Sequence, residues 1–263
     1  MSEPVTPIPA ATILMLRDHQ QNGLEVFMVV RHHQIDFASG ALVFPGGKVD
    51  PGDAEVSAQC DGAADADDAT RALMVGAIRE AFEECGILLA RIPGEADLVS
   101  GERLASLQHY RDALNKGEIS LLEFLQKENL SLACDQLQPF AHWITPDMMP
   151  KRFDTHFYLA RSPDDHIANH DGHESVDSIW ISPDNALNSA DKGKYTIIFP
   201  TRLNIEMLGE SSSVKEALEM AKARTIVPVL PRMEKRDDGN YLCIPPEAGY
   251  RISETKMEKG NTP

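Results

Sequence analysis

Three glutamates near the end of a predicted helix are the residues of this sequence best suited to chemistry. The stretch REAFEECG, residues 79–86, carries Glu80, Glu83 and Glu84 at positions i, i+3 and i+4. In a helix this spacing puts the three carboxylates on one face, where they repel one another. Mg²⁺ and Mn²⁺ prefer oxygen ligands, so a bound divalent cation would turn that repulsion into attraction. The spacing therefore predicts a metal site with Mg²⁺ or Mn²⁺ as the cofactor.

A glycine turn upstream in the chain is expected to complete this site. The segment FPGGKVDPGD, residues 44–53, runs from an apolar strand end into Gly46 and Gly47. Glycines let backbone groups approach a ligand or another segment closely. A carboxylate-rich helix face beside such a turn is a good site for a hard cation.

The helix that carries the glutamates is predicted over residues 70–89. Apolar residues from Leu73 to Cys85 recur at four-residue spacing and form one stripe. Asp67 offers a capping carboxylate before the helix, and Gly86 is a natural stop. The helix is expected to bury its apolar stripe and to show its carboxylates on the other side.

Strands and further helices must surround this helix. Residues 11–18 and 24–32 are apolar and flank a turn-like HQQNG, so they predict an antiparallel hairpin. The other expected strands are 41–44, 139–144, 153–160, 175–181, 226–230 and 241–244, and further helices are expected after Ser182-Pro183, near 201–208 and near 214–224.

The chain shows no internal repeat and no linker, which favours a single domain over residues 1–251. The acidic, alanine-rich residues 50–68 lack a stable period and predict an exposed loop, with 54–68 as an insertion. Residues 102–129 predict two short amphipathic helices as a second insertion. The tail, 252–263, is polar and expected to be loose.

Composition excludes several classes of function. The 263 residues carry a formal charge of −16, which repels nucleic acids and anionic membranes. The four cysteines show no CxxC pair, which is typical of reduced thiols rather than a disulfide framework or a zinc site. The sequence shows neither a membrane-spanning apolar run nor a secretory signal, so we expect a cytoplasmic protein that binds no nucleic acid and no membrane.

The glycine turn and the acidic helix together resemble the signature of the Nudix hydrolase family, Gx5Ex7REUxEExGU, in which U is a bulky aliphatic residue. Gly47 matches the first glycine, and the stretch from Arg79 to Ile87 matches the second half. Asp53 stands where the family has glutamate, and Ala81 stands at the first U position. Between Asp53 and Arg79 lie 25 residues where the signature has seven, an insertion of 18.

This resemblance implies an α+β fold of the Nudix α/β/α sandwich type, with a mixed sheet and additional inserted helices. It implies an enzyme that uses divalent metal to hydrolyse nucleoside diphosphate derivatives. The metal ligands would be the carbonyl of Gly46 with Glu80, Glu83 and Glu84, and Arg79 would orient the glutamates. Glu83 or Glu84 would take the proton from the attacking water, and the sequence leaves that choice open.

A further acid is expected from residues 173–181. Nudix proteins often carry a glutamate shortly before a strand tryptophan, and Glu174 before Trp180 fits that pattern. Asp177 is the alternative acid. The purely structural interpretation is that Glu174 is a solvated loop residue with no role at the site.

Several later segments resemble one branch of the family, which includes the animal peroxisomal coenzyme A diphosphatase and its bacterial relatives. They are WITPDMMPKRFDTHFYLA (143–160), FPTRLN (199–204) and a run from 228 to 245. The resemblance implies that coenzyme A (CoA) or acyl-CoA is split into 3′,5′-ADP and (acyl-)phosphopantetheine. Binding the 3′-phosphate of CoA requires cationic side chains, and the candidates are Arg31, Lys48, Lys151 and Arg152. Arg152 is preferred because it opens the RFDT segment. The alternative for Arg152 is a salt bridge to a surface acid.

Two other functions stay open from the sequence. The same chemistry could act on NADH, ADP-ribose or another nucleotide sugar, or the fold could sense nucleotides without cleaving them. Sensing modules usually lose a helix glutamate, and all three are present here, which favours an enzyme. The oligomeric state is also left open, a homodimer included.

Overall fold

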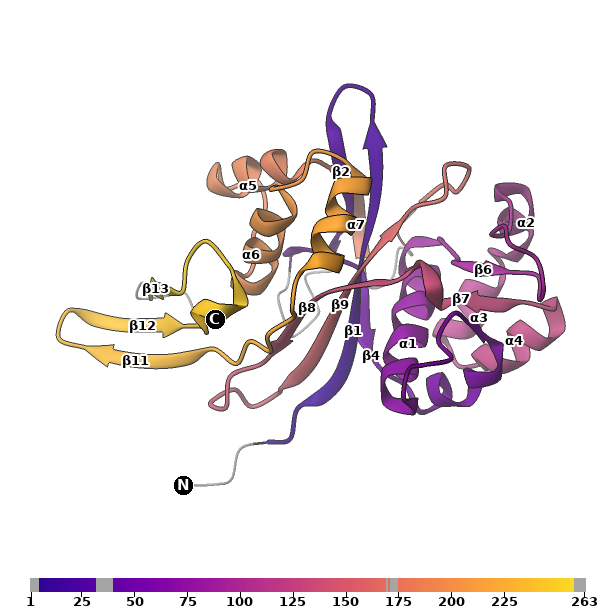
Figure 1. Cartoon of the computed structure of the whole chain (residues 1–263), viewed down its shortest axis with the longest axis horizontal. Coiled ribbons are helices and arrows are strands. Elements are labelled where there is room, and N and C mark those ends of the chain that lie inside the picture. The colour runs from indigo at the N-terminus through magenta and orange to yellow at the C-terminus, as the bar shows by residue number, and fades with distance from the viewer. Residues whose placement is uncertain (1–4, 32–39, 169, 171–174, 258–263) are drawn as a thin grey trace.

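A seven-stranded mixed sheet forms the centre of the fold (Figure 1). The computed structural model describes residues 5–31, 40–168, 170 and 175–257. The strands are β1 (Ile8–His19), β2 (Gly23–Arg31), β3 (Leu42–Val43), β4 (Gly46–Lys48), β8 (Gln138–Ile144), β9 (Phe153–Arg161) and β10 (Ser175–Ile181). The main path is β10-β2-β1-β9-β8, with β3 paired to β2 and β4 to β1. Strands β1 and β9 are parallel and the other pairs antiparallel, and the predicted hairpin is confirmed as β1 and β2.

Helices cover both faces of this sheet (Figure 1). One group is α1 (Asp68–Cys85), α2 (Gly101–Leu107), α3 (Tyr110–Asn115) and α4 (Leu121–Glu128). The other is α5 (Pro183–Asp191), α6 (Phe199–Leu208) and α7 (Val214–Ala223). Each group encloses its own cluster of buried apolar side chains against the sheet. The α+β sandwich with additional helices is therefore confirmed.

Smaller elements complete the chain. A short sheet holds β5 (Cys60–Asp61), β6 (Ala90–Arg91) and β7 (Ser131–Ala133), and another holds β11 (Arg232–Arg236), β12 (Gly239–Cys243) and β13 (Glu254–Lys256). The 3-10 helices are η1 (Pro51–Gln59), η2 (Cys134–Gln136) and η3 (Pro246–Ala248). Among the described residues, no helix has both the length and the apolar character that a membrane span requires.

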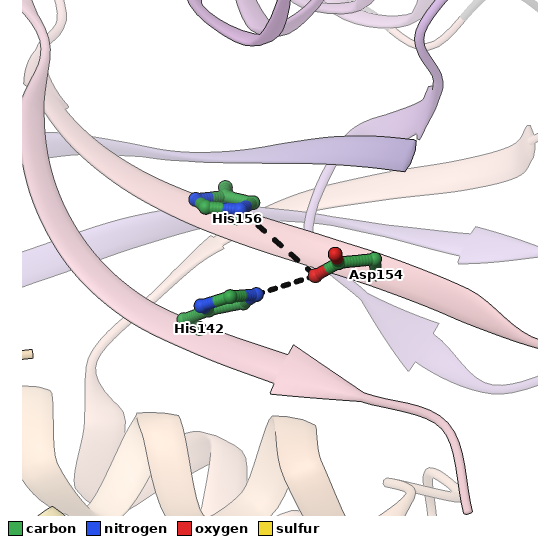
Figure 2. Close-up of side chains that lie close together, drawn as sticks. All are labelled: His142, Asp154 and His156. Atoms are coloured by element: carbon green, nitrogen blue, oxygen red, sulfur yellow. Dashed lines mark hydrogen bonds and ion pairs between the residues drawn. The ribbon is translucent and has the colours of Figure 1, made fainter. Parts of the chain in front are cut away.

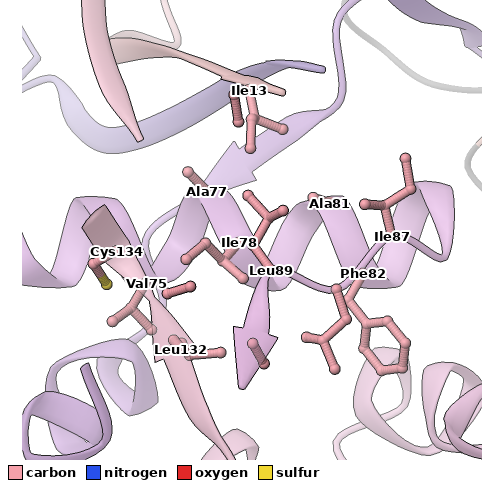
Figure 3. Close-up of a cluster of buried hydrophobic side chains, with 14 of the residues drawn as sticks. Ile13, Val75, Ala77, Ile78, Ala81, Phe82, Ile87, Leu89, Leu132 and Cys134 are labelled. Carbon is pink, nitrogen blue, oxygen red and sulfur yellow. The ribbon is translucent and has the colours of Figure 1, made fainter. Parts of the chain in front are cut away.

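Helix α1 forms as the sequence predicts, and it is enclosed more fully than predicted. The Asp67 side chain accepts the Thr70 N–H at 2.7 Å, and Gly86 ends the helix with a φ of 71°. Figure 3 shows the helix between Ile13 of β1 on one side and Leu132 of β7 on the other. Because packed segments lie on both sides, α1 has little surface left to expose.

The segment 50–68, predicted as an exposed loop, has many exposed side chains but is partly structured and partly buried. It begins with η1, in which Asp53 and Val56 are almost fully buried, and continues into β5. Val56 packs into the same apolar cluster as α1, and this burial draws the segment onto the protein. A single apolar residue in an acidic stretch gives no periodicity, so the sequence pattern did not reveal it.

Two other predictions also need correction. No strand forms at 226–230: Pro228 lacks a backbone donor, and Val229 makes only an isolated bridge to Trp143 of β8. The strand nearby is β11, and its side chains are exposed. The two helices predicted over 102–129 are three, α2, α3 and α4.

Candidate active site

The Arg79 guanidinium is the centre of a buried charge cluster on α1. Its Nε and Nη2 donate to the two carboxylate oxygens of Asp53 at 2.8 and 3.1 Å. Its Nη1 donates to Glu80 and Glu83, both at 2.9 Å. Nη2 also donates to the backbone carbonyl of Lys48 at 2.8 Å. One side chain thus joins the helix, the glycine turn and η1, and the two halves of the signature meet in space despite the insertion.

Two glycines allow these segments to approach one another. A Cβ on Gly47 would lie 2.4 Å from a carboxylate oxygen of Glu80, and a Cβ on Gly76 would lie 3.0 Å from one of Asp53. The Gly46 N–H donates to Glu84 at 3.0 Å. Sequence reasoning missed Gly76, although a glycine inside a helix costs about 1 kcal/mol relative to alanine and so signals a packing reason.

The carboxylates of α1 have little exposure to solvent, because other segments of the protein enclose them; the Glu80 side chain is 13% exposed. Glu83 is 7% exposed and Glu84 8%. Burial raises the pKa of Glu83, and the neighbouring Arg79 opposes that rise. Burial alone would lower the pKa of Arg79, but the hydrogen bond to Asp53 and the surrounding carboxylate charges raise it above its ordinary value.

The charge balance of the cluster fits a divalent metal. Around Arg79 stand the carboxylates of α1, namely Glu80, Glu83 and Glu84, together with buried Asp53 and with Asp50 at 3.8 Å. Four of these acids pair with the guanidinium, and Asp50 among them is exposed. The remaining excess of poorly solvated negative charge is unfavourable without a cation. The side-chain ligands are all oxygens, the donor set that Mg²⁺ and Mn²⁺ prefer.

A cavity of about 660 Å³ lies over the glutamates, within the size range of small-molecule sites. Its lining combines the three glutamates of α1, Gly46 and Gly47 with two lysines and five aromatic residues. The lysines are Lys48 and Lys151, and the aromatic residues are Phe44, Trp143, Phe153, Phe157 and Phe199. The indole N–H of Trp143 donates to the Tyr250 hydroxyl at 2.8 Å, and that hydroxyl donates to Asn204 at 2.7 Å. This chain of hydrogen bonds fixes the Trp143 wall of the cavity.

The structure places the other predicted site residues in different settings. Lys48 lines the cavity, as does Lys151. Arg31 ends β2, but its side chain lies outside the described residues. Glu174 lies entirely outside them. Its alternative, Asp177, is on β10 and does not belong to the cavity lining.

Arg152 does not line the cavity, because its donors are used inside the protein. Its Nε donates to the Thr145 carbonyl at 2.9 Å and its Nη1 to the Val5 carbonyl at 2.7 Å. Its Nη2 lies 2.6 Å from Asp147. In this structure the neighbouring Lys151, rather than Arg152, presents a cation to the cavity.

Comparison with known proteins identifies similar chains. The model of the NUDT19 Nudix domain matches residues 57–208, a stretch that includes all of α1. A Caenorhabditis elegans protein described as putative nudix hydrolase 7 is 27% identical over 237 residues, which cover 89% of this chain and 72% of that protein. The crystal structure of a NUDIX hydrolase from Alicyclobacillus acidocaldarius is similar with a TM-score of 0.65 at 27% identity, covering 82% of this chain and 96% of the other.

The family match agrees with the geometry of the site. It spans more than half of the chain, and it contains the arginine and the three glutamates that surround the cavity floor. Nudix hydrolases generally use divalent metals, and the carboxylates of the cluster are oxygen donors of the kind such ions prefer. This chain therefore belongs to the Nudix family and is a hydrolase of nucleoside diphosphate derivatives.

Proposed function

We propose that the protein hydrolyses the diphosphate of CoA or acyl-CoA to give 3′,5′-ADP and (acyl-)phosphopantetheine. The observation that carries this proposal is that Lys48 and Lys151 line the same cavity as the carboxylates, in a chain whose formal charge is −16. CoA carries a 3′-phosphate in addition to its diphosphate, so it presents two anionic positions to such a cavity. The resemblance to the CoA diphosphatase branch gives independent support.

In this proposal the α1 carboxylates form the reaction centre. Glu80, Glu83 and Glu84 hold the Mg²⁺ or Mn²⁺ together with the carbonyl of Gly46. A divalent metal held by these residues would supply positive charge against the diphosphate and Lewis-acid activation of the water that attacks phosphorus in line. The water oxygen bonds to one phosphorus, the bridging oxygen leaves with the other, and each product ends in a phosphate.

The remaining residues position groups or move protons. Arg79 holds Glu80 and Glu83 in place through hydrogen bonds of 2.9 Å. Glu83 or Glu84 takes the proton of the water. Glu174 stays a proposed further acid.

The cavity walls would select the substrate. Lys48 and Lys151 are the proposed contacts of the 3′-phosphate. Trp143, Phe157 and Phe199 offer aromatic surfaces on which an adenine can stack.

A product analysis with parallel substrates tests this function. The enzyme receives CoA, acetyl-CoA, a long-chain acyl-CoA, NADH and ADP-ribose with Mg²⁺ or Mn²⁺. Release of 3′,5′-ADP from the CoA compounds, with little AMP from the others, is the expected result. Preferential AMP release from NADH or ADP-ribose would keep the Nudix chemistry and overturn the CoA assignment.

Matched glutamate variants test the reaction centre in the same assay. Glu83→Gln and Glu84→Gln each remove one proposed metal ligand while keeping the size of the side chain, so turnover should be lost and the fold kept. Glu219→Gln is the control, since Glu219 is exposed on α7 and pairs with Lys215. Unchanged turnover in both α1 variants would contradict the metal assignment.

A further inference from the structure

A second group of metal-ligating side chains lies on β8 and β9. The ring of His142 is hydrogen-bonded through Nε2 to Asp154, and Nε2 of His156 lies 3.9 Å from the same oxygen. The ligand atoms of all three residues lie within 4.8 Å of one another. Figure 2 shows the rings of His142 and His156 both next to the Asp154 carboxylate.

The strand register brings these residues together. His142 of β8 stands directly opposite His156 of β9, and Asp154 lies two residues earlier on β9. Side chains at this spacing share one face of a sheet and lie within contact distance. The two imidazole rings accordingly stack, with their centroids 4.0 Å apart.

The three residues do not belong to the lining of the substrate cavity. Trp143 and Thr155, which alternate with them along β8 and β9, both line it. Because successive side chains point to opposite faces of a sheet, His142, Asp154 and His156 lie on the other face of the two strands from Trp143 and Thr155. The group is thus distinct from the residues that line the cavity.

The donor set suits a different metal from that of the active site. Two imidazole nitrogens and one carboxylate oxygen are ligands typical of Zn²⁺, Co²⁺ or Ni²⁺, whereas Mg²⁺ prefers oxygen alone. All three side chains are partly exposed, so water can occupy the remaining coordination positions.

We propose that His142, Asp154 and His156 bind one transition-metal ion of the Zn²⁺ class. The ion would join β8, an edge strand of the sheet, to β9 behind the wall formed by Trp143 and Thr155. It would stabilise the folded protein, because a ligand that binds the native state shifts the unfolding equilibrium.

Co²⁺ is the probe that tests this site, since its visible absorption reports the ligands directly. The metal-free full-length protein is titrated with Co²⁺ in the presence of saturating Mg²⁺, and then Zn²⁺ is added to displace it. One equivalent of Co²⁺ with a nitrogen-ligand spectrum is expected, together with a rise in Tm on adding Zn²⁺. His142→Gln, Asp154→Asn and His156→Gln should each weaken binding about tenfold or more.

Two controls separate this site from the others. His109→Gln changes a histidine at the N-terminus of α3, which stacks on Tyr110, and should leave Co²⁺ affinity unchanged. Glu83→Gln should also keep the tight site, because it alters only the α1 carboxylates. Equal Co²⁺ affinity in the wild type and all three cluster variants would overturn the proposal. Loss of the tight site in Glu83→Gln alone would also overturn it. Circular dichroism checks that each variant is folded.

Discussion

Two buried arginines, Arg79 and Arg152, show how differently one residue type is used in this protein. They are equally buried, at 7% and 6% exposure. Arg79 bonds mainly to carboxylates, those of Asp53, Glu80 and Glu83. Arg152 bonds mainly to backbone carbonyls, with a single acid as its partner.

The partners explain the difference in role. The carboxylates paired with Arg79 exceed its charge, so the arginine orders a cluster that remains negatively charged. The partners of Arg152 are satisfied by the arginine itself, which ties the start of the chain to the segment between β8 and β9. Under the proposed function, Arg79 belongs to the reaction centre and Arg152 to the scaffold, and the number of acids around each arginine is what distinguishes them.

The largest effect is expected from Arg79→Lys. Lysine keeps the charge but cannot bond two carboxylates in the fixed planar geometry of a guanidinium. We expect kcat to fall by about a hundredfold or more, because small displacements of catalytic groups have effects of that size. Steady-state kinetics with CoA measures it, and wild-type kcat in this variant would show that Arg79 does not position the glutamates.

Arg152→Met should lower the stability of the fold and leave kcat unchanged, whereas Arg79→Lys should lower kcat. Arg152→Met leaves the carbonyls of Val5 and Thr145 without the hydrogen bonds from Arg152. Val5 is exposed and Thr145 half-buried, so each lost bond costs about 0.5–1.5 kcal/mol. Urea unfolding should show the lower free energy of unfolding, while kcat per folded molecule stays at the wild-type value. A loss of CoA affinity with unchanged stability would instead return Arg152 to the substrate site.

The smallest effect is expected from Gly76→Ala. Alanine favours the helix, but its Cβ would lie 3.0 Å from the Asp53 carboxylate, which three hydrogen bonds hold in place. We expect a net destabilisation of about 1 kcal/mol, since overpacking of this kind costs about 1–3 kcal/mol and helix propensity returns part of it. Gly52→Ala is the control, because nothing lies within 4 Å of that Cβ; stabilisation of the Gly76 variant would mean that η1 is not tightly packed on α1.

The parts of the site that the sequence predicts are those set by local spacing. The carboxylate spacing on α1, its Asp67 cap and its Gly86 stop all depend on residues a few positions apart. The burial of η1 depends on one apolar side chain, Val56, and on the long-range pairing of Asp53 with Arg79. Neither contact produces a periodic pattern of apolar residues in the sequence.

Side-chain contacts between neighbouring strands also could not be predicted from the sequence. The convergence of His142 with Asp154 and His156 depends on the register of β8 against β9 and on a bulge in that pairing. The choice between Lys151 and Arg152 depends on which of two adjacent side chains faces the cavity, and a one-residue shift of register reverses it.

The most direct test of the account compares CoA with dephospho-CoA, which lacks only the 3′-phosphate. The account predicts that kcat/KM is about tenfold or more higher for CoA, since a charged hydrogen bond contributes about 1.5–3 kcal/mol. The ratio of kcat/KM for CoA to that for dephospho-CoA should fall toward one in the double variant Lys48→Ala, Lys151→Ala. It should stay unchanged in Lys215→Ala, which alters an exposed residue of α7. Equal kcat/KM for the two substrates in the wild type would contradict the proposed recognition of CoA by these lysines.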